Sequence, residues 1–275
     1  MKIPFTKAHG AHNDFLLTWR DQLPAGLADM ASVAVAICDR HTGVGADGWL
    51  LVSRSSGVRE NATEDASIEL WNSDGSRSEI SGNGTRCAAA LLAESNIAQR
   101  EVRIGTGAGL KHLRLLARDL RQFTFEMNMG AASIEELHAT IEGRDCTILN
   151  VGNPQCVFFV DNFDFDWQAL GARVERHPRF PNRTNVSFVR VVDGQTVAGH
   201  NLDVRFFERG AGETMSSGTG STGAAAAAVA RGLAETPVRV LTPAGALDLR
   251  WEQDNILLAG PAELVAAGEF FWKGN

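Results

Sequence analysis

The chain has 275 residues, of which 44% are hydrophobic and 21% charged, a composition typical of a globular protein with one large or two ordinary domains. Its formal net charge of −7, without any basic run, argues against nucleic acid or an anionic membrane as a main partner. No signal-peptide core follows Met1, no apolar stretch reaches the ~18 residues of a membrane span, and the four cysteines form no CxxC pair, so we expect a cytoplasmic protein with reduced thiols.

In chain order, strand-like segments outnumber helical ones, and short turns join many of them. Strands are predicted at residues 48–53, 102–106, 123–129, 156–161, 185–191, 238–242 and 256–260. Helices are predicted at residues 27–38, 86–95, 167–177 and 223–233. This mixture favours an α+β fold with mostly antiparallel sheets.

One pattern occurs twice in the chain. Residues 68–94 (IELWNSDGSRSEISGNGTRCAAALLAE) and 204–230 (VRFFERGAGETMSSGTGSTGAAAAAVA) both contain a strand-like run that closes on a polar residue, Asn72 or Glu208. Both reach a serine nine residues later, then run through Gly-x-Gly into an alanine-rich segment, with an offset of 136 residues throughout. Asn13 and Asn153 each precede a further apolar strand, which adds a second match. The matched spacing indicates an internal duplication.

The duplication predicts two pseudo-symmetric domains, the first formed by residues 1–120 with 262–275 and the second by residues 121–261. We expect each domain to be a mostly antiparallel, curved sheet around a central helix, because alanines suit a helix that a sheet encloses tightly. The site is expected in the cleft between the two domains.

The glycine-rich segments do not indicate a nucleotide. Residues 43–48 and 218–223 both match G-x-G-x-x-G, and two matches in one chain show how weak that pattern is. The second match begins ten residues after Glu208, and the next predicted strand ends in Thr242 rather than in an acid, unlike a dinucleotide fold. The histidines and cysteines match no zinc motif, so the sequence indicates neither a nucleotide nor a zinc site.

A helix start with small side chains can instead hold an anion such as a carboxylate, because its first N–H groups are unpaired and carry partial positive charge. If the two halves face each other, Ser81 and Ser217 would flank one bound molecule from opposite sides. Two equivalent groups on opposite faces of one carbon suit the inversion of a stereocentre, in which one side removes the α-proton and the other returns it.

With these residues the chain resembles the diaminopimelate epimerase family over nearly its whole length. The resemblance is carried by FTKAHGAHNDF (5–15), CDRHTGVGADG (38–48), NSDGSRSEISGNGTRC (72–87), GNPQ (152–155), NRTNVSFV (182–189) and ERGAGET with SGTGS (208–221). It implies a cofactor-free epimerase of two pseudo-symmetric domains, usually a homodimer, that interconverts LL- and meso-diaminopimelate for lysine and cell-wall synthesis.

The resemblance also implies a set of site residues. Four asparagines, a glutamate–arginine pair and the two helix starts would bind the substrate: Asn13, Asn72, Asn153, Asn185, Glu208, Arg209, Gly82, Asn83, Gly218 and Thr219. Arg209 suits a carboxylate, and Glu208 could take the ammonium group of the distal centre. The candidate catalytic residues are Ser81, Ser217, Glu208 and Gln155. Each asparagine could instead cap a local turn.

Three of these positions depart from the family pattern. The family has catalytic cysteines where this chain has Ser81 and Ser217, and a histidine in its GNPH motif where this chain has Gln155. A thiol has a pKa of about 8.5, and a lower one at a helix N-terminus, whereas a serine hydroxyl is almost never ionised at neutral pH. Cys87 and Cys156 are poor substitutes, because helix and strand periodicity turn them away from the site.

Three interpretations therefore stay open. The chain could be a slow epimerase of the diaminopimelate type. It could be a relative with a changed reaction, such as another isomerase or a dehydratase. It could also be an amino-acid-binding protein without catalysis.

Overall fold

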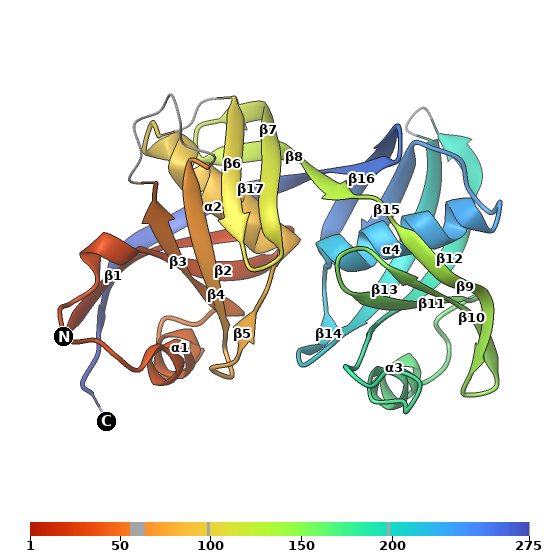
Figure 1. The fold of residues 1–275 in the computed structure, drawn as a ribbon, viewed down its shortest axis with the longest axis horizontal. Coiled ribbons are helices and arrows are strands. Elements are labelled where there is room, and N and C mark those ends of the chain that lie inside the picture. Colours follow the sequence, from red (N-terminus) through yellow and green to blue (C-terminus); the bar gives the residue numbers. More distant parts are fainter. Residues whose placement is uncertain (56–63, 98–99, 197–198, 275) are drawn as a thin grey trace. The chain divides into compact units, whose positions relative to one another are not determined.

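A computed structural model describes residues 1–55, 64–97, 100–196 and 199–274 of the chain. The chain divides into two compact units, which we name unit 1 (Met1–Met127 with Gly260–Asn275) and unit 2 (Asn128–Ala259) (Figure 1). The first division lies inside one strand, Gln122–Gly130, whereas the sequence had suggested a boundary after residue 120. The chain thus enters unit 2 along a strand, without a separate linker.

Unit 1 is a curved sheet around one helix. Its strands are β1 (Lys2–Gly10), β2 (Asn13–Trp19), β3 (Gly48–Arg54), β4 (Ala66–Asn72), β5 (Arg77–Ser78), β6 (Glu101–Thr106), β7 (Gly109–Asp119), β8 (Gln122–Gly130) and the later part of β17 (Asn255–Phe271). Its helices are α1 (Met30–Cys38) and α2 (Gly82–Glu94), with a short 3₁₀ turn at Arg20–Gln22.

The strand pairings of unit 1 form a ring. β1 pairs with β2 antiparallel, β2 with β3 parallel, β3 with β4 antiparallel, and β4 with β6 parallel. β6, β7 and β8 follow as antiparallel neighbours, and β17 pairs with both β8 and β1. A sheet that closes on itself in this way leaves an interior that a helix can fill.

Unit 2 repeats the strand order of unit 1. Its strands are β9 (Ser133–Ile141), β10 (Arg144–Asn150), β11 (Pro154–Phe159), β12 (Asn185–Thr196), β13 (Gly199–Glu208), β14 (Gly212–Thr214), β15 (Val238–Thr242), β16 (Gly245–Glu252) and the first part of β17. Its helices are α3 (Trp167–Glu175) and α4 (Gly218–Ala230). From β9 to β17 the pairings have the same order and the same senses as in unit 1, including parallel pairs β11–β12 and β13–β15.

The equivalent helices also occupy equivalent places in the two units. α1 connects β2 to β3 as α3 connects β11 to β12, and α2 follows β5 as α4 follows β14. The internal duplication and the α+β class predicted from the sequence are therefore confirmed.

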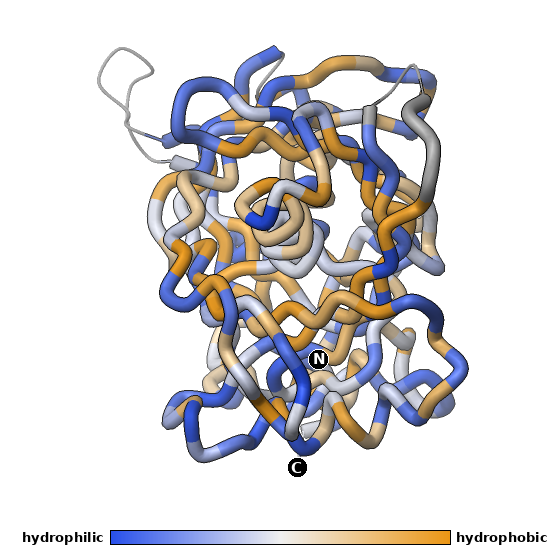
Figure 2. Tube along the Cα trace, turned by 90° about the vertical axis from the view of Figure 1, so that its right-hand side faces the viewer, coloured by the Kyte–Doolittle hydropathy of each residue, from blue (hydrophilic) through white to orange (hydrophobic). Residues whose placement is uncertain are grey.

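Alanine-rich helices fill both sheets. Residues Gly82–Ala93 of α2 are all buried, and in α4 the buried residues run from Gly218 to Ala228 with Thr219 as the exception. Figure 2 shows a helix viewed end-on, surrounded by extended segments that carry many hydrophobic residues. α1 and α3 pack on separate clusters of large apolar side chains, which include Trp49 and Phe188, respectively.

Both central helices begin earlier than the sequence suggested. α2 starts at Gly82 rather than Arg86, and α4 at Gly218 rather than Gly223, because each glycine-rich segment forms the first helical turn instead of a loop. α1 starts at Met30 rather than residue 27, where Asp29 accepts a hydrogen bond from the Ser32 N–H at 3.0 Å.

Candidate active site

Ser81 and Ser217 are the N-caps of the two central helices. Each has extended backbone, with φ −127° and ψ 123° at Ser81 and φ −136° and ψ 123° at Ser217. The Ser81 Oγ accepts a hydrogen bond from the Gly84 N–H at 3.1 Å, and the Ser217 Oγ accepts one from the Gly220 N–H at 3.0 Å. The two candidate catalytic hydroxyls thus have the same place in the two units, each beside the positive end of a buried helix.

The glycines after each serine are required by this close packing. A Cβ on Gly220 would lie 2.9 Å from the Ser217 Oγ and 2.7 Å from a ring carbon of Phe206. A Cβ on Gly84 would lie 3.3 Å from the Cβ of Ser81. Glycine therefore lets the capping serine and the neighbouring strand lie directly against the first helical turn.

In unit 1, two of the candidate substrate-binding residues contact each other. Asn83 Nδ2 donates to Asn13 Oδ1 at 3.2 Å, which joins the second residue of α2 to the start of β2. Arg86, one turn further along α2, donates to Asn83 Oδ1 through Nη2 and to the carbonyl oxygen of Pro261 through Nε at 3.1 Å. Asn72 ends β4 and donates from Nδ2 to Ser76 Oγ at 3.0 Å, so its side chain also holds a turn.

Arg86 is a buried cation. Its side chain is fully buried, and burial lowers the pKa of its guanidinium to about 10, which still leaves it protonated at neutral pH. Its Nη1 has no hydrogen-bond partner among the described residues. Its charge therefore adds to the partial positive charge of the nearby α2 N-terminus, where an anion would be favoured.

In unit 2, Gln155 takes part in a similar contact. Its Nε2 donates to Asn153 Oδ1 at 2.7 Å, and Asn153 Nδ2 donates to Thr219 Oγ1, on the second residue of α4, at 3.3 Å. Gln155 is completely buried against α4, since a Cβ on Gly223 would lie 3.0 Å from its Cγ. Its Oε1 has no partner among the described residues.

The remaining candidates of unit 2 meet where β12 begins and β13 ends. Asn185 Oδ1 accepts from the Arg209 N–H at 3.0 Å, and Asn185 Nδ2 donates to the carbonyl oxygen of Pro154 at 3.0 Å. Glu208 is the last residue of β13, and Arg209 donates from Nη1 to the carbonyl oxygen of Asn182 at 3.3 Å. Asn185 thus holds the backbone of the Glu208–Arg209 pair in place.

The native cysteines lie outside this chemistry. Burial raises the pKa of the Cys87 thiol to about 12, so that this thiol is neutral at physiological pH. Cys156 belongs to the apolar cluster beneath α3, whereas its neighbour Gln155 packs against α4. A hydrogen bond with Cys146, together with burial, raises the pKa of the Cys156 thiol.

Sequence reasoning missed the charged residues that support the site. Asp47 accepts a hydrogen bond from Asn13 Nδ2 at 2.6 Å, and Glu175 accepts one from the Gly210 N–H at 3.2 Å. Asp47 and Arg86 both lie in stretches that carry the family resemblance, which was the available signal. Glu175 lies in none of them, and its role depends on contacts between segments distant in the chain.

A duplicated sheet around two enclosed helices is the fold of solved amino-acid isomerases, among them a hydroxyproline epimerase and a probable proline racemase. The family profile of diaminopimelate epimerase matches residues 5–135 and 147–265. The chain is 36% identical over 288 residues to the diaminopimelate epimerase of Pelotomaculum thermopropionicum, which covers 98% of this chain and 99% of that one. It is 37% identical to that of Microcystis aeruginosa, with the same shares covered. The chain belongs to the diaminopimelate epimerase family, whose members are isomerases.

Solved structures share the duplicated fold at low sequence identity. A phenazine biosynthesis protein of the PhzF family from Bacillus anthracis matches with a TM-score of 0.72 and 14% identity, covering 99% of this chain and all of that one. A hydroxyproline epimerase from Agrobacterium vitis, solved with trans-4-hydroxy-L-proline, matches with a TM-score of 0.68 and 15% identity, covering 98% and 92%. The family match favours an epimerase over a relative with a changed reaction and over an amino-acid-binding protein without catalysis. Among the described residues, no helix is long and apolar enough to cross a membrane.

Proposed function

We propose that this protein interconverts LL- and meso-diaminopimelate by α-proton exchange without a cofactor. The observation that carries the proposal is the identical capping geometry of Ser81 and Ser217 at the starts of two buried helices. The reaction requires that one substrate carbon reach both helix starts. The substrate carboxylate would then be held by first-turn N–H groups, which also stabilise the negative charge that develops when the α-proton leaves.

The other candidates would orient the substrate. Asn13, Asn83 and Asn153 lie beside the helix starts, and Arg209 can hold a second carboxylate through its guanidinium. Glu208 would take the ammonium group of the distal centre. In this proposal Gln155 acts on Asn153 and not on the substrate proton, because an amide does not titrate at physiological pH.

Hydroxyl proton carriers make the proposed reaction slow. The pKa of a serine hydroxyl lies far above that of a thiol, and each pKa unit of this difference costs about 1.4 kcal/mol in the ionisation step. The helix start stabilises either anion and does not remove this difference.

Calorimetry with LL-diaminopimelate tests the binding half of the proposal. We expect Arg209→Ala to weaken binding by about 1.5–3 kcal/mol, the contribution of a charged hydrogen bond. The matched control is Arg173→Ala, which removes a half-exposed arginine of the same unit that pairs with Glu142 at 3.0 Å. Equal affinities in the unaltered protein and Arg209→Ala would exclude Arg209 from the site.

We further propose that the enzyme acts in the cytoplasm as a homodimer and serves lysine biosynthesis. The family resemblance supports the homodimer and the role in lysine biosynthesis, and four buried, free cysteines fit a reducing compartment such as the cytoplasm. Sedimentation equilibrium would show a mass near twice 29.6 kDa if the dimer forms, and a single-chain mass would contradict it.

A further inference from the structure

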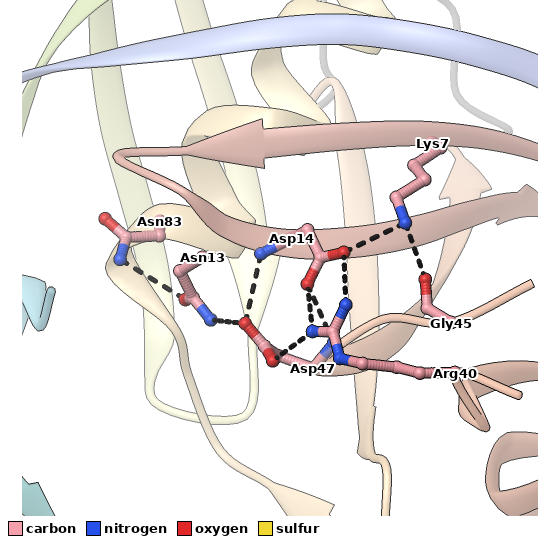
Figure 3. A network of polar contacts seen from close by, with 7 residues as sticks. All are labelled: Lys7, Asn13, Asp14, Arg40, Gly45, Asp47 and Asn83. Atoms are coloured by element: carbon pink, nitrogen blue, oxygen red, sulfur yellow. Dashed lines mark hydrogen bonds and ion pairs between the residues drawn. The ribbon is translucent and has the colours of Figure 1, made fainter. Parts of the chain in front are cut away.

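A continuous chain of hydrogen bonds runs through the two asparagines of unit 1, between two arginines. Arg86 donates to Asn83 Oδ1, Asn83 Nδ2 donates to Asn13 Oδ1 at 3.2 Å, and Asn13 Nδ2 donates to Asp47 Oδ2 at 2.6 Å. At the far end, Arg40 Nη2 donates to Asp47 Oδ1 at 2.8 Å. Figure 3 shows the part that runs from Asn83 through Asn13 and Asp47 to Arg40.

The groups at the two ends determine how both amides are turned. A guanidinium can only donate hydrogen bonds, and an ionised carboxylate can only accept them. If Asn83 were flipped, its NH₂ group would face the guanidinium of Arg86. If Asn13 were flipped, its oxygen would face the carboxylate of Asp47. Each flip would replace a charge-assisted hydrogen bond by a repulsive contact, so only one arrangement satisfies the chain.

A second set of contacts holds the carboxylate end. Asp14 accepts two hydrogen bonds from Arg40, at 2.7 and 3.2 Å, and forms an ion pair with Lys7 at 3.0 Å. Asp47 also accepts the N–H of Asp14 at 3.2 Å, and the Asp47 N–H donates to Asp14 Oδ1 at 3.2 Å (Figure 3). Asp47 is thus fixed by both its backbone and its side chain.

The equivalent contacts in unit 2 lack these charged ends. Gln155 and Thr219 flank Asn153, and both an amide and a hydroxyl can donate as well as accept. Asn153 turns its side-chain nitrogen toward Thr219 of α4, whereas Asn13 turns its side-chain oxygen toward Asn83 of α2. The two halves of the duplicated protein orient corresponding asparagines in opposite senses, and only unit 1 enforces its orientation by charge.

We propose that Arg86, at one end, and Asp47 with Arg40, at the other, are positioning residues that lock the amides of Asn13 and Asn83 in one orientation toward the substrate. The remaining N–H and lone pair of the Asn13 amide then have fixed places, so that a polar ligand can bind there with little loss of side-chain freedom. The role in substrate binding rests on the proposed function, whereas the locked orientation is a property of the free protein.

Nuclear magnetic resonance of the side-chain NH₂ groups tests the lock without any ligand. We expect the Asn13 Nδ2 protons to exchange with solvent about 10- to 150-fold faster in Asp47→Ala, the factor that corresponds to one hydrogen bond to a charged group. The Asn153 NH₂ group, in unit 2, is the internal reference and should not change. The matched control is Asp65→Ala, which removes another acid of unit 1, one that accepts from Arg103. Unchanged exchange at Asn13 in Asp47→Ala would overturn the proposal.

An exchange of polarity separates this positioning role from simple packing. Asn13→Asp alone keeps an acceptor opposite Asn83 but places two carboxylates together at Asp47, and we expect the midpoint of its urea unfolding to fall. The double variant Asn13→Asp with Asp47→Asn restores a donor opposite an acceptor at both contacts, and the midpoint should rise again. A double variant no more stable than Asn13→Asp would contradict the directional lock, even if Asp47→Ala failed to fold.

Binding of LL-diaminopimelate, measured by calorimetry, then tests what the lock does. We expect Asp47→Ala to weaken binding at least about tenfold, and Asp65→Ala to leave it unchanged. Equal weakening by both variants would show a structural role only. Lack of binding by the unaltered protein would contradict the proposed function and leave the exchange results as the test of the lock.

Discussion

Gly223→Ala should destabilise the protein, although the same change in most helices is stabilising. In a helix interior, alanine is ordinarily favoured over glycine by about 0.5–1 kcal/mol. Here the new Cβ would lie 3.0 Å from the Cγ of Gln155, 3.3 Å from its Cβ and 3.4 Å from its Cδ. Gln155 is completely buried and cannot swing into solvent. Overpacking of this kind costs about 1–3 kcal/mol, so we expect a net loss of about 1–2 kcal/mol in the free energy of unfolding.

The reason for the loss can be tested by removing the obstructing side chain. In a Gln155→Ala background the contacts with Cγ and Cδ disappear and only the 3.3 Å contact with Cβ remains, so Gly223→Ala should then stabilise the protein by up to about 1 kcal/mol. Equilibrium urea unfolding of the four proteins of this double-mutant cycle gives the coupling between the two sites, which we expect to be about 1.5–3 kcal/mol. Stabilisation by Gly223→Ala in the unaltered background, or additivity within about 0.5 kcal/mol, would refute the packing argument.

Three further outcomes are expected. Ser81→Ala and Ser217→Ala should each lower the free energy of unfolding by about 1 kcal/mol in urea titrations, and Ser→Gly at either position by only a few tenths of a kcal/mol. Equal losses in the alanine and glycine variants would mean that the hydroxyls are not caps. Burial alone would raise the pKa of Asp14, but hydrogen bonds and charges from Arg40 and Lys7 together hold this pKa below its usual range. The ionised Asp14 therefore contributes its full stabilisation of the fold above about pH 4, and this contribution is lost as the pH falls through the lowered pKa. Arg40→Met should therefore lower the free energy of unfolding by about 1 kcal/mol at pH 7, a small value because the Arg40 side chain is 54% exposed. In acid-unfolding curves this difference between the variant and the unaltered protein should shrink toward pH 2, and an undiminished difference there would contradict the argument. A thiol reagent at pH 8 should modify no cysteine of the folded protein and all four in urea, because all four are buried, and fast labelling of the native protein would count against that burial.

Repeated spacing made the fold predictable from the sequence. The offset of 136 residues that relates Ser81 to Ser217 also relates the strand ends at Asn72 and Glu208, and all four lie at equivalent places in the two units. Because a duplicated sequence must bury the same apolar pattern twice, one repeat is sufficient to infer the other.

The helix starts were predicted less well. The predicted helices begin at Arg86 and Gly223 and leave out Gly82 and Gly218, because glycine has low helix propensity. In the structure they are helical, since a capping serine and a close neighbouring strand compensate for that propensity. Neither compensation can be seen in local sequence.

The charged support of the site could not be predicted at all. Asp47 and Asn13 are 34 residues apart in the chain, and Arg86 and Pro261 are 175 apart. Such contacts depend on which strands become neighbours, which single-residue patterns do not report. The family resemblance marked the stretches that contain Asp47 and Arg86 but assigned them no role.

The most direct test of the proposed reaction follows the α-proton of LL-diaminopimelate by nuclear magnetic resonance in deuterated water. Inversion through two faces must bring solvent deuterium to the inverted carbon. With hydroxyls at Ser81 and Ser217 we expect very slow exchange. The double variant Ser81→Cys with Ser217→Cys should accelerate it by several orders of magnitude, because ionisable thiols then stand at both helix N-termini, and a single Cys should give less. Fast exchange in the unaltered protein, or none in the double variant while it still binds diaminopimelate, would contradict the assignment of these two positions as the proton carriers.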